Sequence, residues 1–331
     1  MARRNYYLFG VLMLMLLGLS WLHLVVSPVN KLTIGDQFSA VFQFDSENFN
    51  HLIARELRIP RLVMAIIAGA GLSVAGLLMQ NLFNNALAGP NILGISTGSS
   101  LFVAFSIMSG IPFFRSDLGI ISSALLGAML FGLIILLFSR FTKSHTSLLL
   151  IGIMIGSFSG AFVSILQLMS DAQELKIFTV WALGSLQQVA FEQLPIIIAS
   201  FLIGIAACFM MIRSLNAMVL GAQSAGVLGI NLKTIKVFII LITALLTGLI
   251  TAFCGPIAFV GLAVPNLMKI VLKTQNNTHL IIGSLLAGGT FMLCCDIIVQ
   301  LLEPTIHLPI NAITSLIGAP FVIFIILKKL T

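Results

Sequence analysis

The sequence predicts an all-α, polytopic membrane helical bundle with about ten transmembrane helices, and its composition and its apolar runs are the evidence. Of 331 residues, 59% are hydrophobic and 8% are charged, whereas soluble domains carry about 25% charged residues. The mean hydropathy is +1.14. The runs 120–138 and 237–253 are broken mainly by Gly, Ala, Ser and Thr, which let helices pack closely in lipid. A membrane β-barrel would instead alternate apolar and polar residues along segments of about ten.

Ten apolar runs are read as spans, since a helix needs about 20 residues to cross a bilayer, although the eighth run is short for a full crossing. The spans are 6–26, 59–82, 92–110, 118–139, 147–169, 191–212, 234–253, 255–268, 280–302 and 308–327. Cys254, Gly255 and Pro256 separate the seventh from the eighth, and one long kinked element there would leave nine.

The basic residues favour ten spans with both termini in the cytoplasm. With ten crossings, the larger share of the 17 Lys and Arg residues lies on the inside, as the positive-inside rule requires. With nine, Lys269, Lys273, Lys328 and Lys329 would lie outside. The first run is also compatible with a signal peptide, but it is long for one and no small-x-small cleavage site follows it. We therefore expect a retained first helix.

The chain is expected to form a single transmembrane domain, 1–331, with two long connecting segments. Residues 27–58 form an outside loop. Residues 213–233 form an inside loop in which Leu215, Met218 and Val219 have helical spacing and three glycines interrupt the pattern. We expect the inside loop to form one or two short helices that lie on the membrane surface and bind a partner protein. The alternative is an ordinary connecting loop.

Motifs for covalent chemistry are absent from the sequence. It has no P-loop, no His-Glu-x2-His zinc motif and no Gly-x-Ser-x-Gly elbow. The four cysteines lie in apolar runs without metal-ligand spacing. We therefore expect no catalytic residue, metal or cofactor, and any ATP hydrolysis belongs to a separate chain. The net charge of +7 does not indicate nucleic acid, because its meaning depends on the side of the membrane on which each charge lies.

Among the acidic residues, only Asp296 sits clearly within a predicted span, since Glu192 stands at the very edge of the sixth. One class of function to consider is an ion-coupled secondary transporter. Such a protein usually needs ionisable groups at midplane depth, and Asp296 would be its best candidate here. The plainer interpretation is a carboxylate bonded to neighbouring hydroxyls or backbone. A membrane-embedded enzyme is a further alternative, but the sequence supplies no nucleophile, acid–base pair or metal site for it.

Two other groups of residues are candidates for function. Gly152, Gly156 and Gly160 share one face of the fifth span, which predicts close helix packing or a face lining a pathway. Arg58 and Arg61 lie at the outer start of the second span. They are expected either to anchor lipid headgroups or to dock an acidic soluble partner.

Motifs along nearly the whole chain resemble those of the FecCD-type permeases of type II ABC importers, which carry iron–siderophores, haem or cobalamin. The motifs are Arg58-x-Pro60-Arg61, Gly76 with Gln80, 85–90, Trp181-x2-Gly184-Ser185-Leu186, 220–229, 255–265 and 308–321.

The resemblance implies a homodimer with a central pathway, two cytoplasmic ABC ATPase subunits and a substrate-binding protein on the outer side. It implies that Arg58 and Arg61 dock the binding protein and that the fifth and tenth spans line the pathway. The resemblance also implies that the inside loop contacts the ATPase and transmits its movement to the helices. The matched positions are Leu220, Gly221, Ala225, Leu228 and Gly229.

The chain departs from the usual family pattern at several positions. Asn266 stands in place of His, Lys269 in place of Arg and Ala86 in place of Pro. His307 replaces a Glu and Asn311 replaces a Gly. The carried chelate, whether ferric siderophore, haem or cobalamin, is not distinguished by these motifs.

Overall fold

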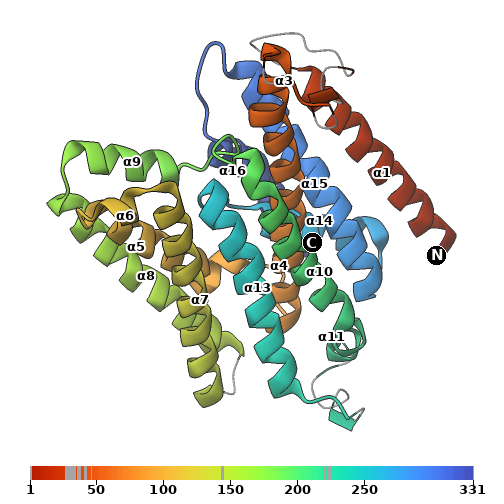
Figure 1. The fold of residues 1–331 in the computed structure, drawn as a ribbon. Helices are drawn as coiled ribbons and strands as arrows, with labels where there is room; N and C mark the ends of the chain where they lie inside the picture. Colours follow the sequence, from red (N-terminus) through yellow and green to blue (C-terminus); the bar gives the residue numbers. More distant parts are fainter. Residues whose placement is uncertain are drawn as a thin grey trace.

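Every element that the structure describes is a helix. The computed structural model describes residues 2–26, 35, 39–40, 43–45, 47–142, 145–219, 221, 226–227 and 229–330. Figure 1 shows how the helices are arranged. In chain order the elements are α1 Ala2–Val25, α3 Phe49–Ile53, η1 Ala54–Arg58, α4 Ile59–Phe83, η2 Pro90–Leu93, α5 Ile95–Met108, α6 Pro112–Arg115, α7 Asp117–Phe141, α8 His145–Met169, α9 Ala172–Ala182, η3 Phe191–Gln193, α10 Leu194–Met210, α11 Ile212–Val219, α13 Leu232–Cys254, α14 Val260–Leu272, α15 Asn277–Leu302 and α16 Ile310–Leu330.

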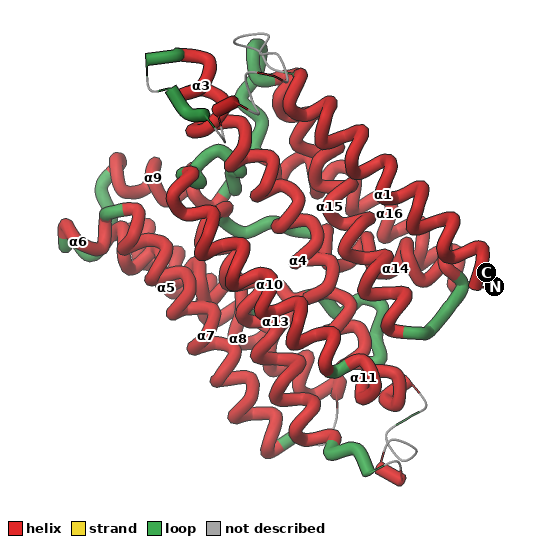
Figure 2. The backbone as a smooth tube through the Cα atoms, turned by 45° about the vertical axis from the view of Figure 1, so that its right-hand side comes forward, coloured by secondary structure: helices red, strands yellow, loops and turns green. Residues whose placement is uncertain are grey.

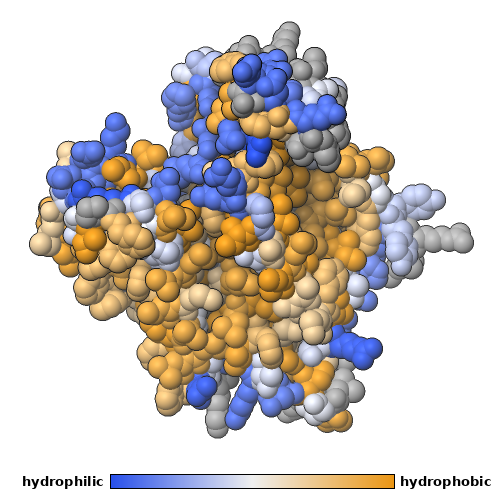
Figure 3. All heavy atoms as spheres, in the orientation of Figure 1, coloured by the Kyte–Doolittle hydropathy of each residue, from blue (hydrophilic) through white to orange (hydrophobic). Residues whose placement is uncertain are grey.

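All ten predicted spans fall on apolar helices. Among the described residues, seven helices are long and apolar enough to cross a membrane, and three shorter apolar ones cover 95–108, 260–272 and 310–324. Figure 3 shows a belt of hydrophobic residues between two hydrophilic ends of the molecule. The predicted membrane helical bundle is thereby confirmed, while ten crossings and the sides of the two termini stay predictions.

The helices form two groups joined through the middle of the bundle. α1, α4, α14 and α16 pack around α15, and α5, α7 and α8 pack together on the other side. α13 contacts both α4 and α7 and so joins the two groups. Figure 2 shows α1, α15 and α16 along one edge and α5, α7 and α8 along the other.

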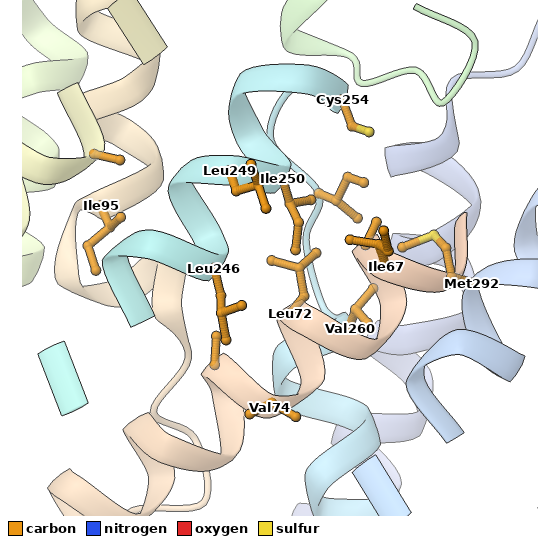
Figure 4. Close-up of a cluster of buried hydrophobic side chains, with 14 of the residues drawn as sticks. Ile67, Leu72, Val74, Ile95, Leu246, Leu249, Ile250, Cys254, Val260 and Met292 are labelled. Carbon is orange, nitrogen blue, oxygen red and sulfur yellow. The ribbon is translucent and has the colours of Figure 1, made fainter. Parts of the chain in front are cut away.

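α4 is the central helix, with nearly every residue from Met64 to Phe83 buried. A Cβ atom at Gly69 would overlap the backbone of Gly288 in α15, and one at Gly76 would overlap that of Gly261 in α14. Glycine at these positions lets the helix backbones touch. In Figure 4, Leu72 lies among apolar side chains of α13 and α14, and Ile67 faces Met292 of α15.

The break after Cys254 separates two helices. α13 ends at Cys254, Gly255 has φ +72°, and α14 begins at Val260 after Phe259 with φ +66°. The structure therefore has two helices here and not one continuous helix, while the number of crossings that they make stays a prediction.

Two connecting segments contain more helix than the sequence predicts. The outside loop was expected to run to residue 58, but from Phe49 the chain is already helical and continues into α4. Between the fifth and sixth spans, Asp171 caps α9 by accepting hydrogen bonds from the Gln173 and Glu174 amides. Figure 1 shows α9 lying across one end of the bundle.

Candidate functional site

A buried charged cluster joins three helices near the start of α4 and the end of α15. We call it the outer cluster because this end of the bundle is predicted to lie outside. Arg61 of α4 forms a bidentate pair with Asp296 of α15, with Nε–Oδ2 at 2.8 Å and Nη2–Oδ1 at 3.0 Å. Its Nη1 lies 3.2 Å from Oε2 of Glu303. Asp296 is only 1% exposed, so paired donors are required to hold its charge inside the protein.

His23 completes the outer cluster from α1. Its Nε2 lies 2.7 Å from Oδ2 of Asp296, and the amide Nε2 of Gln300 donates to the same oxygen at 3.1 Å. His23 is 2% exposed. The expectation that Asp296 bonds to hydroxyls or backbone is therefore wrong, because its partners are side chains of α1, α4 and α15.

The predicted docking residues Arg58 and Arg61 both turn into the protein. Arg58 is 7% exposed and donates from Nη1 to the carbonyl of Leu24 at 2.8 Å. The side chain of Arg61 is 11% exposed and is occupied by Asp296 and Glu303. In this conformation, neither guanidinium group is presented to an external partner.

The three glycines of α8 have different surroundings. A Cβ atom at Gly94, in the turn before α5, would contact backbone atoms of Gly152 and Gly156, and one at Gly156 would contact Thr97. Gly160 has no atom within 4 Å of the position of a Cβ. Two of the three glycines therefore face the start of α5, and the third faces open space. A role in lining a pathway stays a prediction.

The inside loop begins with a helix, as the spacing of its apolar residues predicts. α11 covers Ile212–Val219 and buries Leu215. Gly221 and Gly229 are exposed and have φ of +99° and +76°, a conformation that glycine adopts without strain. Leu220, Ala225 and Leu228 lie outside the described residues.

A chain of asparagines, which we call the inner cluster, connects α11 to the core. Oδ1 of Asn216 in α11 accepts a hydrogen bond from the backbone amide of Asn277 at 2.7 Å. The side-chain oxygen of Asn277 accepts from Nδ2 of Asn81 in α4 at 2.5 Å. Asn277 is the first residue of α15 and is fully buried. Sequence reasoning missed these residues, because an asparagine near a helix end is usually a cap.

Three of the departures from the family pattern hold neighbouring segments together. Lys269 of α14 donates from Nζ to Oε1 of Gln80 in α4 at 2.8 Å. Asn266 donates to the carbonyl of Ala86 at 2.7 Å. Asn311, at the start of α16, accepts from the amide of Ala258 at 3.0 Å. His307 is exposed.

The polar side chains described so far form contacts between helices. Among the residues described, no group of three or more His, Cys, Asp and Glu side chains is placed to hold a metal ion. The polar side chains singled out above instead link helices to one another at the two ends of the bundle.

Comparison with known proteins places the chain among transport proteins. The model of the FecCD transport family matches residues 13–328. A hemin transport system permease of Yersinia pestis is 33% identical over 326 residues, which cover 95% of this chain and 96% of the relative. A vitamin B12 import system permease of Vibrio vulnificus is 32% identical over 307 residues, 92% of each chain.

A solved structure agrees with the sequence comparisons. It is an inward-facing conformation of a protein assigned as a metal-chelate type ABC transporter. The two chains share 27% identity with a TM-score of 0.86, over 97% of this chain and 99% of the other. Both the sequence and the path of the backbone thus match over almost the full length.

Proposed function

The chain belongs to the FecCD transport family, and from this membership we propose that it serves a binding-protein-dependent importer driven by ATPase subunits on separate chains. Members of the family are ABC transporter permeases, non-catalytic components of the membrane. The chain is accordingly a multi-pass membrane permease. The match of the family model to residues 13–328 is the observation that carries the proposal.

The proposed cargo is an iron chelate, either a ferric siderophore or haem, or else cobalamin. Support comes from the relatives, which are named for hemin and for vitamin B12, and from the structural neighbour, assigned to metal chelates. These cargoes are large, rigid metal chelates. A pathway of weakly binding side chains suits them, because tight binding would trap the cargo within the membrane.

We propose that two copies of the chain enclose the pathway between their α8 and α16 helices. Only 17% of the apolar stretch of α8 is buried within the chain. Phe158 and Phe162 are among its exposed side chains. Leu316 and Phe324 are exposed on α16. A second copy would cover part of these faces, and Gly160 would allow a close approach.

The proposed coupling segment is the inside loop, 213–233, including Leu220, Gly221, Ala225, Leu228 and Gly229. Its first part, α11, is bonded through Asn216 to Asn277 of α15, and through Asn277 to Asn81 of α4. A displacement of α11 by an ATPase would therefore act directly on two helices of the core. Transport requires the helices to move between an outward-facing and an inward-facing state, and a displacement of α11 would favour one of these states over the other.

The proposed docking of the binding protein at Arg58 and Arg61 requires these side chains to exchange their partners within the chain for acidic residues. Reversing both to Glu is the test, read as binding-protein affinity and its salt dependence. We expect the affinity to fall and the salt dependence to weaken. Unchanged values would reject these two residues as the dock.

The experiment for the function as a whole is ATPase activity in lipid nanodiscs. This chain is co-purified with its ATPase, and the binding protein is added empty or loaded with ferric siderophore, haem or cobalamin. Stimulation by one loaded binding protein is the expected result and identifies the cargo. Failure of the chain to associate with any ABC ATPase would contradict the proposal.

The ion-coupled secondary transporter is not favoured by the structure. Asp296, its best candidate group, is occupied by Arg61 and His23. Membership in the FecCD transport family also provides an ATP-driven alternative.

A further inference from the structure

Three of the sequence motifs meet at residues 255–259, the segment between α13 and α14, which we call the crossover. Gly255 and Ile257 of the crossover are buried. α14 has 13 residues and is therefore about 20 Å long, whereas the apolar core of a bilayer is about 30 Å thick. The crossover thus supplies the rest of the predicted eighth span as backbone that is not helical. Such backbone is tolerated at membrane depth where the protein surrounds it and satisfies its polar groups.

The chain that follows α9 holds the first part of the crossover. The amide of Ser185 donates to the carbonyl of Cys254 at 2.9 Å. Gly184 has φ +78°, and a Cβ atom on it would contact the carbonyl oxygen of Cys254 and the side chain of Ile310 in α16. A Cβ atom at Gly255 would overlap the backbone of the last turn of α9. Figure 1 shows the chain running from α9 towards α16. Glycine at these two positions lets the three segments touch.

α16 holds the second part of the crossover at two points. Oδ1 of Asn311, in the first turn of α16, accepts a hydrogen bond from the amide of Ala258 at 3.0 Å. About two turns further along, a Cβ atom at Gly318 would overlap the Cβ atom of Phe259. Phe259 has φ +66°, which is rare for a bulky residue and persists only where the surrounding structure enforces it. The crossover is therefore fixed between α16 and the end of α9.

Asn311 supplies the polar part of this attachment. The Ala258 amide lies in a half-buried stretch of non-helical backbone, and the Asn311 side chain gives it an acceptor. Two hydrogen bonds then connect α16 to the end of α9, from Asn311 to the crossover and from the Cys254 carbonyl to Ser185. Coupling between helices requires a contiguous physical connection of this kind.

We propose that Asn311 is a positioning residue that makes α16 and the end of α9 move as one unit. The inference rests on the proposed function insofar as α16 is taken to line the pathway. A displacement of α16 moves the Ala258 amide through Asn311, and the crossover carries the displacement to Ser185. The pathway helix then changes state together with the helix that lies across one end of the bundle.

Hydrogen exchange of the purified chain in nanodiscs tests the attachment. Asn311→Ala removes the acceptor. Asn311→Asp keeps an acceptor oxygen, and a carboxylate is favourable in the first turn of a helix. We expect Asn311→Ala to speed exchange about fivefold at Ala258 and also at 183–186, as the loss of one hydrogen bond allows. Asn311→Asp should exchange like the wild type. Thr305→Ala is the matched control, because Thr305 is exposed just before α16 and its hydroxyl bonds within its own turn.

Transport by the reconstituted complex tests the consequence. The ratio of cargo transported to ATP hydrolysed is expected to fall several-fold in Asn311→Ala and to recover in Asn311→Asp. A merely structural role of Asn311 would lower hydrolysis and transport together and leave their ratio unchanged.

Three results would overturn the proposal. Faster exchange at Ala258 with no change at 183–186 would show that the crossover transmits nothing to the end of α9. Equal exchange in Asn311→Ala and Asn311→Asp would remove the role of the acceptor. An unchanged transport ratio in Asn311→Ala would remove the consequence for the pathway. Failure of the wild type to associate with an ATPase would instead contradict the proposed function, and the exchange measurements, which need no ATPase, would still decide the attachment.

Discussion

The two ends of α15 are attached to the rest of the bundle by different chemistry. At the outer cluster, the attachment is a buried ion pair between Asp296 and Arg61, supported by His23. At the inner cluster, it is a chain of neutral amides through Asn277, Asn216 and Asn81. Both clusters tie α15 to α4, and each adds one further helix, α1 outside and α11 inside.

The difference separates a fixed attachment from an adaptable one. Removing one partner of a buried ion pair leaves an uncompensated charge, which costs about 3–5 kcal/mol. Removing one neutral hydrogen bond costs about 1 kcal/mol net. In this conformation the outer end of α15 is therefore held firmly, and Arg61 could leave it only in exchange for another acidic partner. The inner end, beside the proposed coupling segment, can exchange partners at low cost.

Asp296→Asn should produce the largest loss of stability. It leaves Arg61 with Glu303 but without its bidentate partner, so we expect up to about 3–5 kcal/mol of destabilisation, measured as thermal unfolding in nanodiscs. Arg115→Leu breaks the Glu174 pair, in which the Arg115 side chain is 45% exposed, and should cost at most about 1 kcal/mol. Equal losses in the two variants would remove the distinction between buried and exposed pairs.

His23→Phe should have the next largest effect, about 2 kcal/mol, because it removes a hydrogen bond to a charged group. We expect the loss of stability to concentrate in α1, because only 6% of the apolar stretch of this helix is buried within the chain. Hydrogen exchange of α1 measures it directly. His307→Phe, at an exposed outer position, is the control, and the same increase in exchange for both variants would contradict the role of His23.

Asn277→Ala should cost about 1–2 kcal/mol, because the Asn81 amide loses its acceptor. The nearby Gln275→Ala, at an exposed position, should be neutral. Thermal unfolding of the two variants side by side gives the comparison. A loss as large as that of Asp296→Asn would show that the inner end is held as firmly as the outer end.

Lys269→Met should give the smallest effect, about 1 kcal/mol, since Lys269 is partly exposed and its bond to Gln80 joins a charged and an uncharged group near the surface. Lys273→Met, an exposed lysine at the end of the same helix, should leave the midpoint of unfolding unchanged. Indistinguishable midpoints for these two variants would show that the Gln80 contact contributes nothing.

Composition and apolar runs predict most of the bundle, because lipid imposes the same requirement on every span. The runs identify ten apolar helices, and the spacing of Leu215, Met218 and Val219 identifies α11. α9 is missed because its eleven residues are too short and too mixed to be recognised as a span.

The pairings within the two clusters are not predictable from local pattern. Arg61 and Asp296 stand out as charges in or beside spans, but they are 235 positions apart in the chain, and no local periodicity joins them. Asn81 and Asn277 carry no charge and lie at helix ends, where asparagine is common. Their roles depend on the packing of α4 against α15, which only the fold provides.

Coupling through the inner cluster is tested most directly by the ratio of cargo transported to ATP hydrolysed in liposomes. The reconstituted complex carries Asn216→Leu, with Ser214→Ala as the control on the same helix. We expect Asn216→Leu to assemble with its ATPase and to hydrolyse ATP while the ratio falls several-fold. An unchanged ratio, with assembly and hydrolysis intact, would contradict transmission from α11 to α15 and α4.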